Sequence, residues 1–486
     1  MKFRWLKFLI AALVVTAGVM VCTQSLDNDS WYVLAEGKEI VENGIYYEDR
    51  LSMHEGLEVT VQNYGFAVIF YLVYQAFGPV GIYIGMLLLN LLLCYLLYKI
   101  CMLLSNKNEN LSLLIIVLTD LLLGRWFVVT RAQMVSFCVI MLVIYILELY
   151  IKTNKNKYLW YVPLLSLFEI NSHASAWPMI LIVLIVYIID SLKLKKMHLQ
   201  GYKTRPLLAI LLVSVFVGFL NPYGLKMMTL MVTSYAVPEA QSSIIELGAF
   251  RPFGGSFNIL LYLSFVLTII FYIFGKKQNI RVRWLIMLFG FLALGLNTIK
   301  GLGYLILVLL FPLAGIYRDV RIENYIPKRF CWATIGWIGI LGICVIVAVG
   351  IARVPEVLNG PNEELVATMD ALDEFTKEVD RNNLKVYTGY DEGGYAEYRG
   401  YRTYIDPRME VFIKANNGKE NIFQEWYDLR HGDIERDIFL QKYDFDYLVV
   451  GEDDKLYNLD GDYELVFEKD NGDDNKGMRL YKKVNV

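Results

Sequence analysis

The chain has 486 residues, of which 56% are hydrophobic and 20% charged, and its mean hydropathy is +0.42. This composition excludes an ordinary soluble protein, because several apolar runs reach the roughly 20 residues that cross a hydrocarbon core. The formal net charge of −3 identifies no class of partner, and we expect no nucleic-acid binding. The six cysteines lie in or beside apolar runs, which indicates neither a disulfide framework nor a cysteine metal site.

The first apolar run, residues 6–24, follows a basic start and lacks small residues before a cleavage point, so we interpret it as an uncleaved span. Further runs lie near residues 79–104, 133–151, 172–192, 206–220, 257–275 and 331–351. We expect about eleven transmembrane helices within residues 1–351. Residues 61–78 are short, aromatic and end next to a proline, so we expect them to lie along the outer interface or to re-enter it.

The orientation follows from the basic loops, because Lys and Arg accumulate on the cytoplasmic side of a membrane. The clearest basic loops are 152–157, 193–205, 276–283 and 318–329. Placing them inside makes the N-terminus cytoplasmic, residues 25–62 the first external loop, and residues 352–486 extracytoplasmic.

Residues 352–486 change abruptly to a composition rich in Asp, Glu, Asn, Gly and Tyr. A helical pattern at 361–379 precedes β-prone pieces at 384–389, 403–406, 446–451, 463–468 and 479–484. The sequence therefore predicts a polytopic α-helical membrane protein with a C-terminal extracytoplasmic α/β domain. Within that domain, Gly393 and Gly394 predict a strand-to-helix turn with close backbone approach, and Asp406 with Arg408 a local structural pair.

Polar and ionisable residues at the ends of spans are expensive enough to indicate function. With this topology, Asp29 is the candidate catalytic residue. The candidate substrate-binding residues are Asp27, Asp49, His54, Arg125, Arg131, Gln133, Asn171, His173 and Lys300.

Each candidate also has a simpler interpretation. Asp29 is equally a solvated residue after a span, and Trp31 with Tyr32 fits an interfacial aromatic belt. Arginines at span ends anchor helices as well as binding phosphate. His173 fits a loop histidine, a general acid or base, or a metal ligand. Lys300 fits a phosphate counter-ion and a snorkelling anchor alike.

The order of several short motifs resembles the GT-C superfold of polytopic glycosyltransferases, and most closely a poorly characterised bacterial branch of it. The motifs are 29-DSWYVLAEGKEIVENGIYYEDRLS-52, 131-RAQMVS-136, 171-NSH-173, 221-NPYG-224, 244-IIEL-247, 393-GGY-395 and 406-DPR-408. The chain departs from the usual pattern at Asn28 and Ala132, where proline is common, and at Val33, where histidine is common. The missing histidine weakens the case for a metal.

This resemblance implies transfer of a sugar from a polyprenyl-phosphate donor to a cell-envelope acceptor, a glycan, lipid or protein, on the outer face of the membrane. Asp29 and Asp27 match the second and first acids of the family's Asp-x-Asp-like stretch, and Asp29 would act as the base. A divalent metal ion stays open as a cofactor. The alternatives are a transporter or lipid-handling scaffold, and a catalytically inactive GT-C-like envelope protein.

Overall fold

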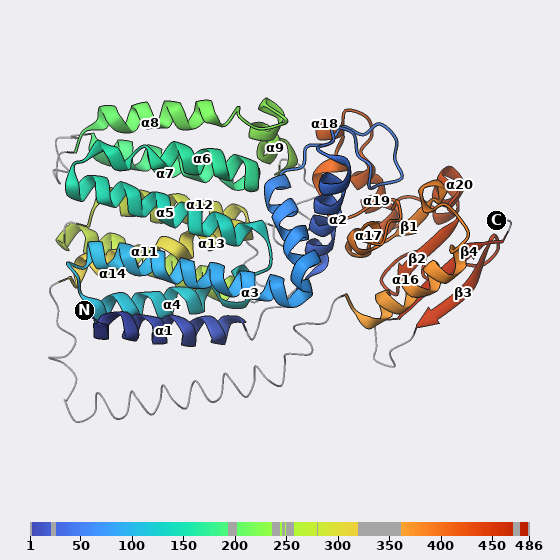
Figure 1. Cartoon of the computed structure of the whole chain (residues 1–486), viewed down its shortest axis with the longest axis horizontal. Helices are drawn as coiled ribbons and strands as arrows, with labels where there is room; N and C mark the ends of the chain where they lie inside the picture. Colours follow the sequence, from blue (N-terminus) through green and yellow to red (C-terminus); the bar gives the residue numbers. More distant parts are fainter. Residues whose placement is uncertain are drawn as a thin grey trace, which may run out of the picture. The chain divides into compact units, whose positions relative to one another are not determined.

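The computed structural model (Figure 1) describes residues 2–20, 26–192, 202–235, 257–278, 280–318, 361–469 and 477–484, with two isolated positions at 244 and 248. The expected span at 331–351 lies outside these residues, as do most of the basic loops at 193–205 and 318–329 and most of the motif at 244–247.

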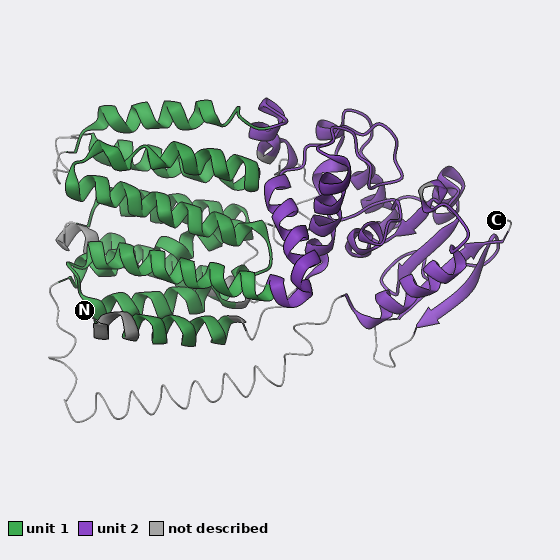
Figure 2. Ribbon diagram, viewed as in Figure 1, with its two compact units in different colours: residues 1–24, 83–221, 244–357 green, residues 25–82, 222–243, 358–486 purple. Residues whose placement is uncertain are grey.

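The chain forms two compact units, coloured separately in Figure 2. Unit 1 comprises residues 1–24, 83–221 and 244–357, and unit 2 comprises residues 25–82, 222–243 and 358–486. The segment expected as the first external loop therefore belongs to the same unit as the C-terminal tail. A domain boundary at residue 351 stays a prediction.

Unit 1 is a helical bundle whose helices run side by side (Figure 1). Its helices are α1 (Lys2–Met20), the second part of α3 (Tyr64–Leu104), α4 (Glu109–Phe127), α5 (Ala132–Thr153), α6 (Tyr161–Ser172), α7 (Trp177–Ser191), α8 (Thr204–Val217), α11 (Phe257–Gln278), α12 (Val282–Asn297), α13 (Ile299–Leu309) and α14 (Phe311–Ile316). Short 3₁₀ turns η1 (Asn156–Tyr158) and η2 (Ala174–Ala176) join some of them.

Four stretches among the described residues are long and apolar enough to cross a membrane: Tyr64–Leu104, Ala132–Thr153, Ala174–Ser191 and Ile299–Ile316. Shorter apolar helices lie at Lys7–Val19, Thr204–Val217, Leu261–Ile273 and Val282–Asn297. These helices fit a membrane protein, while a total of about eleven spans stays a prediction.

Helix α3 is broken at Gly78, whose φ of 61° lies in the left-handed region that glycine tolerates. Pro79 follows, and a proline disfavours helical geometry in the residue before it. The part of α3 before the break belongs to unit 2 and residues from 83 onward to unit 1. The break thus falls at the end of segment 61–78. The expected position of this segment, along the outer interface or re-entering it, stays a prediction.

Unit 2 contains a four-stranded sheet in the order β1-β2-β4-β3. Its strands are β1 (Val386–Thr388), β2 (Tyr447–Gly451), β3 (Tyr463–Lys469) and β4 (Met478–Lys483). Strands β1 and β2 are parallel, whereas β4 runs antiparallel to both β2 and β3. Its helices are α2 (Asn28–Asn43), the start of α3, α9 (Leu225–Tyr235), α16 (Glu363–Phe375), α17 (Tyr390–Tyr398), α18 (Lys414–Asn417), α19 (Ile422–His431) and α20 (Arg436–Tyr443), with 3₁₀ turns η5 (Arg381–Asn383) and η6 (Met409–Val411).

The predicted strand at 403–406 is wrong. Thr403 makes only isolated bridges, with Ser52 and with Val386. The chain then turns, because the Asp406 carboxylate accepts a hydrogen bond from the backbone N–H of Arg408 at 2.7 Å. A carboxylate that binds the backbone two residues on favours a turn over a continued strand.

Helix α2 packs against α17 through an aromatic side chain and a glycine. Trp31 is 4% exposed and lies edge-on to Tyr395, with ring centroids 4.8 Å apart. A Cβ atom on Gly394 would lie 2.8 Å from the backbone nitrogen of Tyr32, so the two helix backbones meet at this point. Trp31 is therefore a core residue of unit 2, and the alternative of an interfacial belt is wrong for this side chain.

The glycine pair lies elsewhere than expected. Gly393 and Gly394 are inside α17, and the strand-to-helix turn is at Gly389. The predicted close backbone approach is confirmed, since a Cβ atom on Gly393 would lie 2.1 Å from the carbonyl oxygen of Ile405.

The first prediction concerns this helix contact. Gly394→Ala should destabilise the protein by about 1–3 kcal/mol, because the added methyl group forces α2 and α17 apart. The apparent melting temperature of the full-length protein in detergent measures the effect. Gly315→Ala is the matched control, because nothing lies within 4 Å of its added Cβ atom. Equal melting temperatures for the two variants would contradict the packing described.

Candidate functional site

Asp27 and Asp29 stand at the beginning of α2. Asp27 is the N-cap: its carboxylate accepts from the backbone N–H of Ser30 at 2.9 Å and from its hydroxyl at 2.7 Å, and the Asp27 N–H donates back to the Ser30 hydroxyl. Such a reciprocal cap satisfies backbone donors at the helix start. Asp29 lies in the first turn and is half-buried. Asp27 thus has a structural role, and the side chains of Asp27 and Asp29 are both partly exposed.

Asp29 also faces the C-terminal part of unit 2. Burial raises the pKa of the Tyr390 hydroxyl, and the negative charge of Asp29 is the largest neighbouring charge that raises it further. Tyr390 begins α17, and its hydroxyl donates to the carbonyl oxygen of Pro407 at 2.9 Å. The candidate base therefore lies within electrostatic reach of the tail.

Arg408 is the centre of a buried ion network in unit 2. The side chain has no solvent exposure, and its guanidinium contacts Asp49 at 2.7 Å, Asp406 at 2.7 Å and Glu397 at 3.2 Å. The local pair predicted for Asp406 and Arg408 is confirmed. Asp49 comes from the segment after α2, so one guanidinium binds parts of the chain 359 residues apart.

The carboxylates around Arg408 differ in their protonation. Burial raises the pKa of Asp49, but the Arg408 charge and hydrogen bonds from Ser52 outweigh it, so the pKa is lowered overall. Burial raises the pKa of Glu36 and of Glu397 well above the usual range, although Arg408 opposes it. One oxygen of each of these two glutamates is buried without a hydrogen-bond partner. Asp49 is thus held as the anion, while both glutamates favour the protonated form.

His54 packs within the tail part of unit 2. Its Nε2 atom lies 2.8 Å from the carbonyl oxygen of Tyr404, and its ring lies edge-on to those of Tyr404 and Tyr443. Burial lowers the pKa of His54. His54 and Asp49 therefore both fasten the segment after α2 to the tail, and substrate binding by either stays a prediction.

In unit 1 the structure brings together several candidates from the bundle. His173 follows α6 and hydrogen-bonds Ser136 of α5 through Nδ1 at 2.7 Å and Ser175 through Nε2 at 2.9 Å. The charge of Lys300, in the first turn of α13, acts on His173. Asn171 donates to the carbonyl oxygen of Leu220 at 3.1 Å, which ties the end of α6 to the chain after α8.

The remaining candidates of unit 1 lie near helix ends. Arg131 is the N-cap residue of α5, and Gln133 lies in the first turn of that helix. Arg125 follows Gly124, where α4 is interrupted by a φ of 30°. Among the described residues, no group of three or more His, Cys, Asp or Glu side chains is placed to hold a metal ion. We therefore derive no catalytic step through a metal.

The sequence gives no indication that two glutamates of unit 2, Glu36 and Glu397, are buried. Glu36 lies in an amphipathic helix, where a glutamate is ordinarily exposed, yet it is 2% exposed. Glu397 is equally unexpected in the 390–398 helix. Their burial depends on contacts between segments far apart in the sequence, such as the packing of α2 on α17.

No family model matches the chain, and no curated protein matches it in sequence. Among solved structures, the chain is similar to the oligosaccharyltransferase of Archaeoglobus fulgidus, crystallised with Zn and sulfate. The match has a TM-score of 0.55 at 11% sequence identity and covers 91% of this chain and 67% of that one. This chain therefore shares its fold with that enzyme, which supports the GT-C-like architecture that the order of motifs implies.

The second prediction concerns the buried glutamates. The unfolded chain ionises Glu36 near pH 4.3, whereas the folded chain keeps its proton to a higher pH, so this group costs stability as the pH rises above that value. Glu36→Gln should therefore raise the apparent melting temperature at pH 8 and have little effect at pH 4. Glu39→Gln, on the same helix but partly exposed, is the control. A lower melting temperature for Glu36→Gln at pH 8 would show that the carboxylate is held charged.

Proposed function

We propose that this protein is a membrane glycosyltransferase that moves a sugar from a polyprenyl-phosphate donor to a cell-envelope acceptor on the outer face of the membrane. The observation that carries the proposal is the shared fold with an oligosaccharyltransferase over 91% of the chain. Apolar helices long enough to span a membrane and a partly accessible Asp29 on the tail-bearing unit support it.

The proposed reaction inverts the configuration of the transferred sugar. Asp29 takes the proton of an acceptor hydroxyl, whose oxygen attacks the anomeric carbon of the donor. The bond from that carbon to the phosphate oxygen breaks, and polyprenyl phosphate leaves with the electron pair. Arg125, Arg131 and Lys300 would stabilise the charge on the departing phosphate, because preorganised cations usually supply the largest catalytic effect.

The transporter alternative finds less support in the bundle. A transport path would need its intramembrane acids to be available. Glu148 instead pairs with Arg283 at 2.7 Å, Arg283 also pairs with Asp190 at 2.9 Å, and Asp120 accepts from Asn90 at 3.1 Å. These three acids brace helices to one another, which is a structural role, whereas neither carboxylate oxygen of the buried Glu169 has a hydrogen-bond partner within the described ranges.

The third prediction tests the base. Asp29→Asn should lower transfer by about two orders of magnitude, because an amide cannot accept the acceptor's proton. Release of polyprenyl phosphate from a panel of polyprenyl-phosphate sugars, with an envelope extract as acceptor source, is the measurement. Asp27→Asn is the matched control, since asparagine caps a helix as well as aspartate does. Full activity in Asp29→Asn would remove the catalytic assignment and favour the scaffold or inactive alternatives.

The fourth prediction tests sidedness. Single cysteines in place of Asn28 and Asp433, both exposed in unit 2, should react with a membrane-impermeant thiol reagent on intact cells. A background without the native cysteines removes competing labelling. A cysteine in place of Lys155, in the basic loop after α5, should react only after lysis. The reverse pattern would place unit 2 in the cytoplasm and exclude transfer on the outer face.

A further inference from the structure

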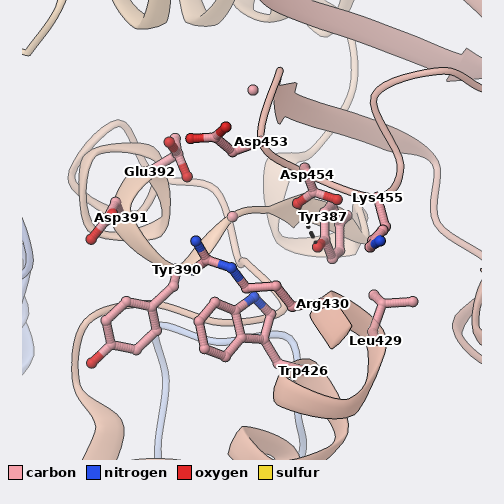
Figure 3. A pocket seen from close by; sticks show the side chains of 12 residues that line it. Tyr387, Tyr390, Asp391, Glu392, Trp426, Leu429, Arg430, Asp453, Asp454 and Lys455 are labelled. Carbon is pink, nitrogen blue, oxygen red and sulfur yellow. Dashed lines mark hydrogen bonds between the residues drawn. The ribbon is translucent and has the colours of Figure 1, made fainter. Parts of the chain in front are cut away.

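A cavity of about 110 Å³ opens at one end of the sheet in unit 2 (Figure 3). It lies beyond the carboxyl ends of the parallel strands β1 and β2, where open α/β sheets bind ligands in general. Gly389 and the start of α17 form one wall, the loop after β2 a second, and α19 a third. Its lining includes Tyr390, Glu392, Trp426, Arg430, Asp453 and Lys455.

Several charged groups in this cavity are not committed to the fold. In the part of the chain that the structure describes, the exposed side chains of Asp453 and Lys455 have no hydrogen-bond or ion-pair partner, whereas the Glu392 carboxylate accepts from its own backbone N–H. The guanidinium of Arg430 lies over the ring of Trp426, 5.5 Å from its centroid. Figure 3 shows Glu392, Asp453 and Arg430 around the cavity, and the charge of Arg430 acts on Glu392. The cavity therefore offers both acceptors and donors to a ligand.

The helix that begins at this cavity does not make it an anion site. Asp391 and Glu392 occupy the first turn of α17, and the Glu392 carboxylate folds back over Gly389, where a Cβ atom would meet its oxygen. Acidic side chains at a helix start satisfy the positive end of the helix dipole. An incoming phosphate would meet these carboxylates first.

A simple cation fits the cavity no better. Arg430 and Lys455 line it together with the acids. Burial, with the charge of Asp391, raises the pKa of Glu392 to about 7, so this carboxyl carries only part of a charge at neutral pH. A neutral ligand that both donates and accepts hydrogen bonds can bind the acidic and the basic side chains of the cavity together.

We infer that the cavity at the carboxyl ends of β1 and β2 binds one neutral sugar unit of a glycan. Sugar hydroxyls donate to Asp453 and Glu392 and accept from Lys455 and Arg430, and Tyr390 and Trp426 belong to the same lining. The cavity is smaller than the roughly 300–1,000 Å³ of sites for larger ligands, which suits a single ring. The inference extends the proposed function, since it gives the acceptor a chemical class, but the binding is measurable without transfer.

Tyr390 is a neighbour both of the cavity and of Asp29. Tyr390 is part of the cavity's lining, and the charge of Asp29 acts on its hydroxyl. A glycan held in the cavity therefore lies on the same unit as the candidate base.

The test uses the full-length protein in lipid nanodiscs and saturation-transfer NMR titrations. The probes are the methyl glycosides of glucose, galactose and mannose, with cationic methyl glucosaminide and inorganic phosphate as comparisons. At least one neutral glycoside should bind. Asp453→Ala and Lys455→Ala should each weaken it about tenfold, because each loses a charge-assisted hydrogen bond. Asp460→Ala, an exposed residue of the loop after β2 that does not line the cavity, should bind like the wild type.

Asp453→Ala and Lys455→Ala remove charges of opposite sign, so their effects distinguish neutral, cationic and anionic ligands. Glucosaminide binding alone, weakened by Asp453→Ala and strengthened by Lys455→Ala, would overturn the inference in favour of a cation. Phosphate binding that Lys455→Ala weakens and Asp453→Ala strengthens would overturn the inference in favour of an anion. Absence of binding by all three neutral glycosides would also overturn the inference. Transfer activity without glycoside binding would overturn the sugar site alone, whereas glycoside binding without transfer would overturn the proposed function alone.

Discussion

The structure of unit 2 depends on one buried guanidinium. Arg408 binds Asp406 and Glu397 of the tail and Asp49 of the segment after α2, and it is fully buried. Removing one partner of a buried ion pair costs about 3–5 kcal/mol, because the other charge stays buried without compensation. Burial raises the pKa of Glu397, and the charges of Asp406 and Asp49 raise it further, because three carboxylates surround one cation. This network makes residues 25–82 part of the tail unit.

That arrangement divides the candidate residues between two bodies. Asp27, Asp29, Asp49 and His54 belong to unit 2, whereas Arg125, Arg131, Gln133, Asn171, His173 and Lys300 belong to unit 1. The candidate base and the candidate phosphate-binding cations thus lie in different units of the chain.

Local patterns in the sequence predicted more of the fold than of the site. Strands β1, β2, β3 and β4 lie within one or two residues of their predicted positions, because alternation and turn residues are local signals. Asp406 and Arg408 are two residues apart, so their pairing is also local. The partner Asp49 is 359 residues from Arg408, and no local pattern records such a contact. The same reason explains Trp31, whose burial depends on Tyr395 of a distant helix.

The ion network and the proposed sugar site are physically connected. Pro407, between Asp406 and Arg408, accepts the hydrogen bond from the Tyr390 hydroxyl at 2.9 Å, and Tyr390 is part of the cavity's lining. Asp406 and Arg408 fix the turn that presents this carbonyl oxygen. The position of Tyr390 therefore depends on the same guanidinium that holds Asp49. Asp29 raises the pKa of the Tyr390 hydroxyl, so the cavity lining and the candidate base share this side chain as a neighbour.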